Sequence, residues 1–361
     1  MTSRTMTTKY IVVQTAFLGD VLLTLPLCGA IKRMDPTAHV VLVTTPAACE
    51  FVKGLPVVDE VVAFDKRGQH RSRASRKTFA SSLNAHANTV VIVPHKSVRS
   101  MLLVRSMKAQ RIVTYSDAAT RWIATDVVPY PLHMLDARRH LALLNPLGAE
   151  KYTLESLVPI SLQSHADESW ANVELRADTG PIVALAPGAA WPTKRWPIAY
   201  FRALASKLVQ SGAQVVIVGD SSVQGAMDGI SGVIDLAGKT TLRQAAAIIA
   251  RSNVVISNDS APVHLASLQH VPVVALFGPT VPEFGFAPFG PNVQVIERAN
   301  LACRPCSAHG SERCPLGTHV CMTKISVDTV FDSVHHFIHA HDENRNASAK
   351  TTTSSQEDFP H

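Results

Sequence analysis

The sequence lacks the segments that would anchor or export the chain. No run of 18 uncharged apolar residues exists, which argues against a transmembrane helix. The apolar run at residues 10–13 is too short for a secretory signal and is soon followed by Gln14 and Asp20. Six cysteines in 361 residues are too few for a disulfide scaffold, so we expect a reducing, cytoplasmic compartment.

Several signatures of nucleotide and metal chemistry are also missing. No two glycines have the G-x-G spacing of the dinucleotide fingerprint. Residues 232–240 only approach a P-loop, because five residues separate the glycines where the motif has four, and these five resemble a strand. There is no H-E-x-x-H, no G-x-S-x-G and no D-x-D pair that would hold a divalent metal.

The composition that is present indicates a folded protein of about two domains. Hydrophobic residues make up 46% and charged residues 17% of the chain, so there is enough apolar area to offset chain entropy. Residues 1–165 contain 20 Lys and Arg against 11 Asp and Glu, whereas residues 166–361 contain 14 against 17. The first half is therefore expected to attract anionic partners.

Strands alternate with helices along the chain. Continuous Val and Ile runs, rather than apolar–polar alternation, indicate strands buried on both faces of a parallel sheet. The expected strands are 10–14, 39–43, 61–64, 89–93, 182–185, 214–218, 253–257 and 273–277, and the expected helices are 21–34, 198–210, 242–250, 263–269 and 327–340. We predict an α/β fold of two Rossmann-like, doubly wound domains that face each other across a cleft.

The polar stretch 163–179 marks the expected boundary, a linker with a short helix. The first domain is assigned to 1–165 and the second to 178–341, and residues 342–361 are expected to be disordered because they have little apolar content.

Three loops at the carboxyl ends of strands combine residues suited to chemistry. Asp20 in the first is either a first-turn carboxylate facing the helix dipole or a general base. The second, 186–197, contains Gly188 and Lys194 and would suit a phosphate, or is a rigid Pro/Trp turn with two exposed cations. The third, 257–266, is either an anion site at a helix start or an ordinary capped helix with a buried histidine.

The order of these motifs resembles a known family. L-G-D near the N-terminus is followed by P-G-x-x-W-x-x-K-x-W-P, by N-D-S-x-P-x-H-L-A and by P-V-V-A-L-F-G-P-T. Together they resemble the heptosyltransferases of lipopolysaccharide synthesis, glycosyltransferase family 9, and most of all the heptosyltransferase II branch, over residues 10–340. The resemblance implies the GT-B fold, with the acceptor on the first domain and the nucleotide-sugar on the second.

The resemblance also implies roles for single residues. Asp20 matches the family's catalytic base, Lys194 the lysine at the donor phosphate, and Asp259 the aspartate that binds the donor sugar. Ser260, Ala261 and His264 match the family's segment around the donor diphosphate, and Gly188 lies in the loop beside it. Asp220 and Leu242 fall where the family holds the nucleoside. The sequence departs from the family at Ala261, where Gly is commoner, and at Ala189 and Ala190, which replace hydroxyl residues. The loop 281–286 is unusual and is a candidate for altering sugar or acceptor preference.

A basic run at 66–77 has six cations and no acid. It is a solvated loop, a nucleic-acid site, or an anion-binding acceptor site. No aromatic residue is interleaved to stack bases, which disfavours nucleic acid as a partner. The resemblance implies an acceptor site for anionic inner-core lipopolysaccharide, made by Lys66, Arg67, Arg71, Arg73, Lys96 and Arg99 and extended by Arg138 and Arg139. Such cations also suit an anionic membrane surface, so we expect peripheral contact with the inner membrane.

Four cysteines, Cys303, Cys306, Cys314 and Cys321, lie within 19 residues in the segment 303–321. They could hold a structural zinc, with His309 and His319 as alternative ligands, form two disulfides, or remain free thiols. The resemblance implies that catalysis itself needs no metal.

These observations predict an inverting glycosyltransferase that moves heptose from ADP-heptose to the lipopolysaccharide inner core. A base takes the proton of the acceptor hydroxyl, and the leaving diphosphate is stabilised by Lys194 and the helix start near Ser260. The alternatives are a transferase of another nucleotide-activated sugar to another anionic acceptor, and a metal-stapled nucleic-acid-binding protein. The last leaves the loops of Lys194 and Asp259 without a role.

Overall fold

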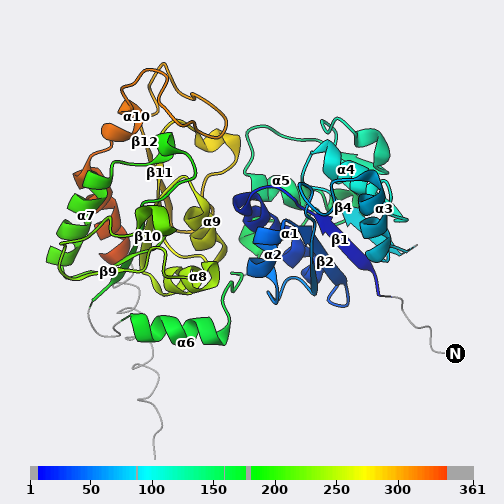
Figure 1. The fold of residues 1–361 in the computed structure, drawn as a ribbon, viewed down its shortest axis with the longest axis horizontal. Coiled ribbons are helices and arrows are strands. Elements are labelled where there is room, and N and C mark those ends of the chain that lie inside the picture. Colours follow the sequence, from blue (N-terminus) through cyan, green and yellow to red (C-terminus); the bar gives the residue numbers. More distant parts are fainter. Residues whose placement is uncertain (1–6, 87, 158, 176–179, 340–361) are drawn as a thin grey trace, which may run out of the picture. The chain divides into compact units, whose positions relative to one another are not determined.

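The computed structural model describes residues 7–86, 88–157, 159–175 and 180–339, which divide into two compact units (Figure 1). Unit 1 contains the chain up to Gln163 together with the segment Pro282–Phe286, and unit 2 contains the rest. The chain therefore passes between the units after residues 163, 281 and 286. The tail 342–361, expected to be disordered, lies outside the described residues.

Unit 1 is built on a parallel six-stranded sheet with the order β3-β2-β1-β4-β5-β6. Its strands are β1 (Lys9–Val13), β2 (His39–Thr44), β3 (Glu60–Ala63), β4 (Thr89–Ile92), β5 (Arg111–Tyr115) and β6 (Asp126–Val128). Its helices are α1 (Leu18–Met34), α2 (Pro46–Val52), α3 (Arg73–Ser82), α4 (Val98–Val104) and α5 (Asp136–Ala142), with short 3-10 turns at Arg121–Ile123, Asn145–Leu147, Leu154–Ser156 and, in the returning segment, Pro282–Phe284.

The helices of unit 1 cover both faces of its sheet. The α3 and α4 side chains Phe79, Met101 and Val104 pack on Ile11 and Val91 of the central strands. Helices α1 and α5 pack against each other on the opposite side, as Figure 1 shows. The carboxyl ends of β1, β3, β4 and β5 thus share one edge of the sheet, where the loops leading into α1, α3 and α4 begin.

Unit 2 repeats this plan, with the order β12-β11-β10-β7-β8-β9. Its strands are β7 (Ile182–Ala186), β8 (Gln214–Ile217), β9 (Val233–Asp235), β10 (Val254–Asn258), β11 (Val273–Phe277) and β12 (Val293–Glu297). Its helices are α6 (His165–Glu174), α7 (Ile198–Gln210), α8 (Leu242–Arg251), α9 (Ala261–Leu268) and α10 (Val320–Thr323), a further helix over 327–339, and 3-10 turns at Pro192–Lys194 and Ser221–Val223. Counted within each unit, the strand order of both sheets is the 3-2-1-4-5-6 order of the Rossmann fold.

The predicted pair of doubly wound parallel sheets is confirmed, and the helix at 198–210 has the expected bounds. The sequence analysis missed β5, β6 and β12. These strands lie at or next to sheet edges, and β6 and β12 have exposed or half-buried residues rather than continuous buried runs. The short helix expected in the linker is α6, which packs with Trp170 and Ala171 on unit 2.

In the portion of the chain that the structure describes, none of the helices has the length and apolar character to cross a bilayer.

Candidate functional site

In unit 2, Lys194 and Asp259 form an ion pair at the carboxyl edge of the sheet. Lys194 Nζ lies 2.6 Å from Asp259 Oδ2, and the two side chains are only 15% and 6% exposed. Lys194 ends a 3-10 turn after β7, and Asp259 directly follows β10, which pairs with β7. The fold therefore brings together the two residues that the sequence analysis assigned to the donor phosphate and the donor sugar.

Buried side chains fix the loop that carries Lys194. Trp196 is 1% exposed, its backbone N–H donates to Asn258 Oδ1 at 2.9 Å, and its indole N–H donates to Ile325 O at 3.0 Å. Asn258 also donates to Pro187 O at 2.8 Å. The strand that delivers Asp259 thus also holds both ends of the lysine loop, and the Lys194 ammonium is held in place before any ligand binds.

The start of α9 lies beside this ion pair and has backbone donors for an anion. No side chain among the described residues caps the helix, because the Ser260 hydroxyl bonds Gly188 O at 3.3 Å instead. Pro262 has no N–H and the Val263 N–H donates to Ser260 O at 3.1 Å, so the backbone donors left at this helix start are those of Ser260 and Ala261. Together with the nearby ammonium they suit a diphosphate. His264, one turn into the helix, is buried.

Thr280 is a functional candidate that the sequence analysis missed. Its hydroxyl donates to Asp259 Oδ2 at 2.7 Å and is buried, and its carbonyl accepts from Arg304 at 2.7 Å. Thr280 closes the F-G-P-T motif, so the motif itself marked the position. The Asp259 carboxylate thus has two partners, Thr280 and Lys194, which fix its orientation.

Asp220 and Leu242 occupy neighbouring loops of the same sheet edge. Asp220 is exposed and accepts from Ser222 N at 2.8 Å, and this hydrogen bonding holds the pKa of its carboxyl below the usual range. Leu242 is half-buried and opens α8, which Thr241 and Gln244 cap reciprocally. The structure shows no contact that joins either residue to Lys194 directly, and their role toward a nucleoside remains a prediction.

The cysteine-rich segment holds the lysine turn and does not form the expected zinc site. Cys303, Cys306, Cys314 and Cys321 are free thiols, and no group of three or more His, Cys, Asp or Glu in the described ranges is arranged to hold a metal ion. The zinc prediction is therefore not supported, and neither are the two disulfides.

The contacts of this segment explain its place in the fold. His319, named above as an alternative ligand, instead pairs its Nε2 with Thr193 O at 2.7 Å. Thr193 and Ser311 exchange two further hydrogen bonds of 2.8 Å. Gly310 leaves no room for a side chain, because an added Cβ would lie 2.8 Å from Trp191 Cβ and 3.2 Å from Lys194 Cγ.

In unit 1, Asp20 is the third residue of α1, at the carboxyl edge of the sheet. Phe17 precedes the helix without a side-chain cap, and the Asp20 carboxylate accepts hydrogen bonds from backbone N–H groups of Asp20 and Phe17 at this helix start. Burial raises the pKa of the Asp20 carboxyl, the Asp136 carboxylate raises it further, and His140 opposes that rise. A carboxylate with a raised pKa is a stronger base than an exposed one.

Lys66 is the predicted acceptor cation that the structure relates to Asp20, and Arg99 is a charged neighbour of Lys66. Lys66 Nζ donates to Thr15 O at 2.6 Å, and its pKa is lowered by burial and by Arg67 and Arg99, while Asp20 opposes the change. The loop at Thr15 is also tied to His95, whose Nδ1 lies 3.1 Å from Thr15 Oγ1. Burial and the Lys66 charge lower the pKa of His95 to about 4, so this ring is neutral at physiological pH.

The other predicted cations divide into three groups. Arg67, Arg71 and Arg73 are exposed, and none belongs to an ion pair of the described residues. Lys96 is paired with Asp117 at 2.8 Å and lies 3.3 Å from the centre of the Tyr130 ring. Arg139 is only 2% exposed, because its guanidinium is bonded to acceptors inside unit 1. Its predicted place in an acceptor site is therefore wrong. Arg138 pairs with Glu155.

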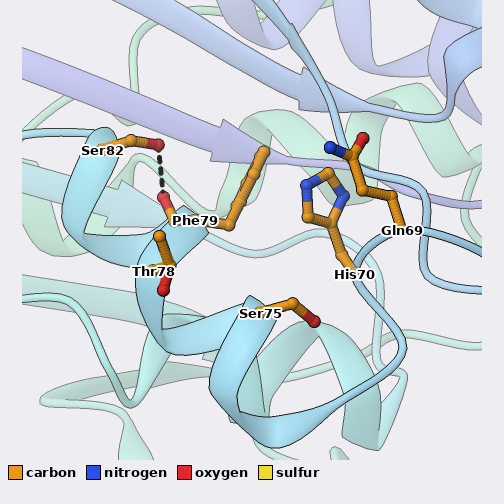
Figure 2. A pocket seen from close by; sticks show the side chains of 6 residues that line it. All are labelled: Gln69, His70, Ser75, Thr78, Phe79 and Ser82. Atoms are coloured by element: carbon orange, nitrogen blue, oxygen red, sulfur yellow. Dashed lines mark hydrogen bonds between the residues drawn. The ribbon is translucent and has the colours of Figure 1, made fainter.

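A pocket of about 370 Å³ lies between the basic run and α3, lined by Gln69, His70, Ser75, Thr78, Phe79 and Ser82 (Figure 2). His70 Nδ1 accepts from Asp65 N at 3.0 Å, and its ring stacks on Phe64. In the neutral ring the proton is then on Nε2, where it remains a donor. Hydroxyls, an amide and an imidazole surrounded by exposed arginines suit a polar, anionic group.

Known proteins resemble the chain in sequence and in fold. A model of glycosyltransferase family 9 (heptosyltransferase) matches residues 76–315. Lipopolysaccharide heptosyltransferase 2 of Salmonella typhimurium is 26% identical over 305 residues, which cover 76% of this chain and 84% of that protein. The same-named enzyme of Escherichia coli is 26% identical over 294 residues, with the same coverage.

Two solved structures share the fold. A glycosyl transferase of family 9 from Veillonella parvula has a TM-score of 0.80 at 24% identity, over 92% of this chain and 97% of its own. The ADP-heptose lps heptosyltransferase II of Escherichia coli has a TM-score of 0.73 at 21% identity, over 92% and 99%. These likenesses confirm the predicted α/β architecture of GT-B type.

Proposed function

Since the chain belongs to glycosyltransferase family 9, we propose that it transfers heptose, with inversion, from ADP-heptose to the inner core of lipopolysaccharide. The observation that carries the proposal is the buried Lys194–Asp259 pair beside the uncapped start of α9. The Lys194 ammonium and the backbone N–H groups of Ser260 and Ala261 meet the leaving diphosphate, and the fixed Asp259 carboxylate meets sugar hydroxyls. The relatives of this chain that are named heptosyltransferase support the choice of sugar.

In the proposed mechanism Asp20 removes the proton from the acceptor hydroxyl. The hydroxyl oxygen then forms a bond to the anomeric carbon while the bond from that carbon to the diphosphate oxygen breaks, and ADP leaves with the negative charge. Lys194 and the α9 start stabilise this charge most strongly in the transition state, where it develops. The raised pKa of Asp20 makes it a better proton acceptor, and the reaction as written uses no cofactor.

The acceptor is proposed to bind unit 1 through its anionic groups. Lys66 lies in the electrostatic surroundings of Asp20, with Arg99 close to Lys66. Arg67, Arg71 and Arg73 extend positive charge along the loop to α3. The pocket in Figure 2 offers a place for one phosphate or carboxylate of the core. Lys96 contributes less, because Asp117 already neutralises it.

We also propose that the enzyme works at the cytoplasmic face of the inner membrane, where it meets its lipid-linked acceptor. Residues 66–116 contain eleven Lys and Arg and no Asp or Glu. Helices α3 and α4 lie within this stretch, and Arg73 and Lys77 on α3 and Arg105, directly after α4, are exposed. Such a surface is attracted to anionic lipids.

The proposal is tested by donor binding and transfer with the full chain. A ligand present at one hundred times its Kd stabilises a protein by about 2.7 kcal/mol, so ADP should raise Tm clearly and UDP should not. Asp20→Ala should keep the ADP shift and lose transfer by at least a hundredfold, an ordinary size for a general base. Asp35→Ala, at the other end of α1, is the control.

Stabilisation by UDP but not by ADP would favour transfer of another nucleotide-activated sugar. Near-normal turnover by Asp20→Ala would remove Asp20 from the base role.

A further inference from the structure

The segment Pro282–Phe286 leaves unit 2 after β11 and is held in unit 1 by its backbone. Asp136 N donates to Gly285 O at 2.9 Å. The Arg139 guanidinium donates to Phe284 O at 3.2 and 3.3 Å from its two terminal nitrogens. These bonds use main-chain carbonyls, so they fix the path of the chain whatever side chains the segment carries.

The guanidinium of Arg139 is bonded on all sides by acceptors of unit 1. It is 2% exposed, pairs with Asp136 Oδ1 at 2.8 Å, and donates to Pro131 O at 2.9 Å, to Leu132 O at 2.5 Å and to Tyr130 Oη at 2.8 Å. Only a guanidinium has enough N–H groups in a rigid planar fork to satisfy so many acceptors. A buried cation is costly unless it is paired in this way, which indicates that the site is built around Arg139.

Gly285 is shaped to the same site. Its φ of +102° is in the region that favours glycine, and an added Cβ would lie 2.8 Å from the nearest Arg139 nitrogen and 2.9 Å from Met134 O. The segment and the arginine therefore fit each other without spare room.

The contacts of Arg139 connect to residues of the proposed reaction in two directions, through α5 and through the segment Pro282–Phe286. On one side, Asp136 and His140 belong to α5, and His140 Nδ1 lies 3.0 Å from Leu23 O and 3.3 Å from Thr24 Oγ1 on α1, the helix of Asp20. Thr24 Oγ1 itself donates to Asp20 O at 2.8 Å.

On the other side, a single residue, Val281, separates the segment from Thr280. Thr280 donates to Asp259 at 2.7 Å. The chain thus runs from the donor carboxylate of unit 2 directly into the clamp of unit 1.

We propose that Arg139 is a positioning residue for sugar transfer. By holding the backbone of Phe284 and Gly285, it links the Thr280–Asp259 donor contact, through the chain, to α5 and to α1, the helix that carries Asp20. Its task is to hold the acceptor-activating and donor-binding groups in register during the reaction. Errors of about 1 Å in such alignment can cost about a hundredfold in rate. This inference rests on the proposed function.

The test compares Arg139→Met and Gly285→Ala with the wild-type chain. We expect kcat to fall tenfold or more in both, while the Kd for ADP, measured by calorimetry, stays within twofold, because every donor contact in unit 2 is untouched. Arg139→Lys should recover part of kcat, since it keeps the charge beside Asp136 but reaches fewer carbonyls.

Two control variants separate positioning from general damage. Arg202→Met removes another arginine that donates to two carbonyls, Ala226 O and Asp228 O, in unit 2. Arg121→Met removes an exposed arginine from unit 1, the unit that contains Arg139. Both should keep kcat within twofold.

Two results would overturn the proposal: kcat within twofold of wild type in folded Arg139→Met or Gly285→Ala, or an equal loss of ADP affinity and kcat. If Arg139→Met does not fold, Gly285→Ala decides, since it leaves every charge in place. A wild-type chain that transfers no heptose would instead refute the proposed function.

Discussion

Among single residues, Asp20 shows how its proposed role as a base is linked to a cost in stability. Its pKa is raised first by burial and then by Asp136, so the folded state disfavours the ionised carboxylate. The unfavourable contribution is fully present above the folded-state pKa and disappears below the usual value of 3.8. A base in a polar, exposed site would avoid this cost but would be weaker.

The upward shift of the Asp20 pKa predicts how the stability of Asp20→Asn depends on pH. Above pH 7 the variant should melt a few degrees higher than wild type, because an amide can accept the same backbone hydrogen bonds without the burial cost of a charge. The gap should close as the pH falls toward 4, and transfer should be lost at every pH. Thermal melts from pH 4 to 8 measure it, and Asp35→Asn should show no such gain. A variant less stable than wild type at pH 8 would contradict the assignment.

At the scale of elements, the cysteine-rich segment acts as a support for the Pro192–Lys194 turn. Its hydrogen bonds from Ser311 and His319 converge on Thr193, next to the donor lysine. The segment has no strand and only the short helix α10, so these contacts, rather than regular structure or a metal, determine its path past the turn.

Gly310→Ala tests this support. The new Cβ would meet Trp191 and Lys194, and the φ of +96° is strained for alanine, so we expect a loss of about 1–3 kcal/mol in stability and roughly tenfold weaker binding of ADP-heptose. Gly317→Ala is the matched control, because it has a φ of +68° and no atom within 4 Å of its added Cβ. It should lose stability without losing donor affinity. Equal affinity losses in the two variants would argue against a role for the packing on Lys194.

The elements also show what the sequence could predict. Buried strands such as β7 and β10 were found because both faces are apolar, and the loops that follow them brought Lys194 and Asp259 together as expected. Arg139 was misassigned because no sequence pattern shows that its guanidinium is buried among nearby acceptors and the carbonyl of Phe284, which is 145 residues away. The cysteine spacing predicted a metal because four cysteines within 19 residues suit a zinc site, but spacing alone does not establish a ligand geometry, and the described residues contain none.

For the whole molecule, charge is concentrated in one unit. The surplus of positive charge in residues 1–165 and the acid-free stretch 66–116 give unit 1 a surface for anions, while the second half of the chain carries a surplus of acids. Association with a membrane should therefore depend on unit 1 and weaken with salt, since exposed charges are screened within about 10 Å at 0.1 M ionic strength.

Vesicle binding measures this distribution. Each cation near an anionic surface contributes about 1 kcal/mol, so Arg73→Gln with Lys77→Gln should weaken binding to phosphatidylglycerol vesicles roughly thirtyfold. Arg251→Gln with Lys324→Gln removes the same charge from unit 2 and should have little effect. Equal weakening by both pairs of substitutions, or equal binding of the wild-type chain to neutral vesicles, would show that Arg73 and Lys77 on α3 are not responsible for membrane binding.

The return of residues 282–286 to unit 1 limits how such enzymes can be recombined. A chimaera cut once near residue 163 supplies Arg139 from one parent and the peptide it grips from the other. Because the grip is on carbonyl oxygens, most foreign side chains should be tolerated, but a parent with a bulkier residue in place of Gly285 should not. Exchange of sugar specificity by swapping halves therefore depends on compatibility at one glycine, far along the chain from the crossover point.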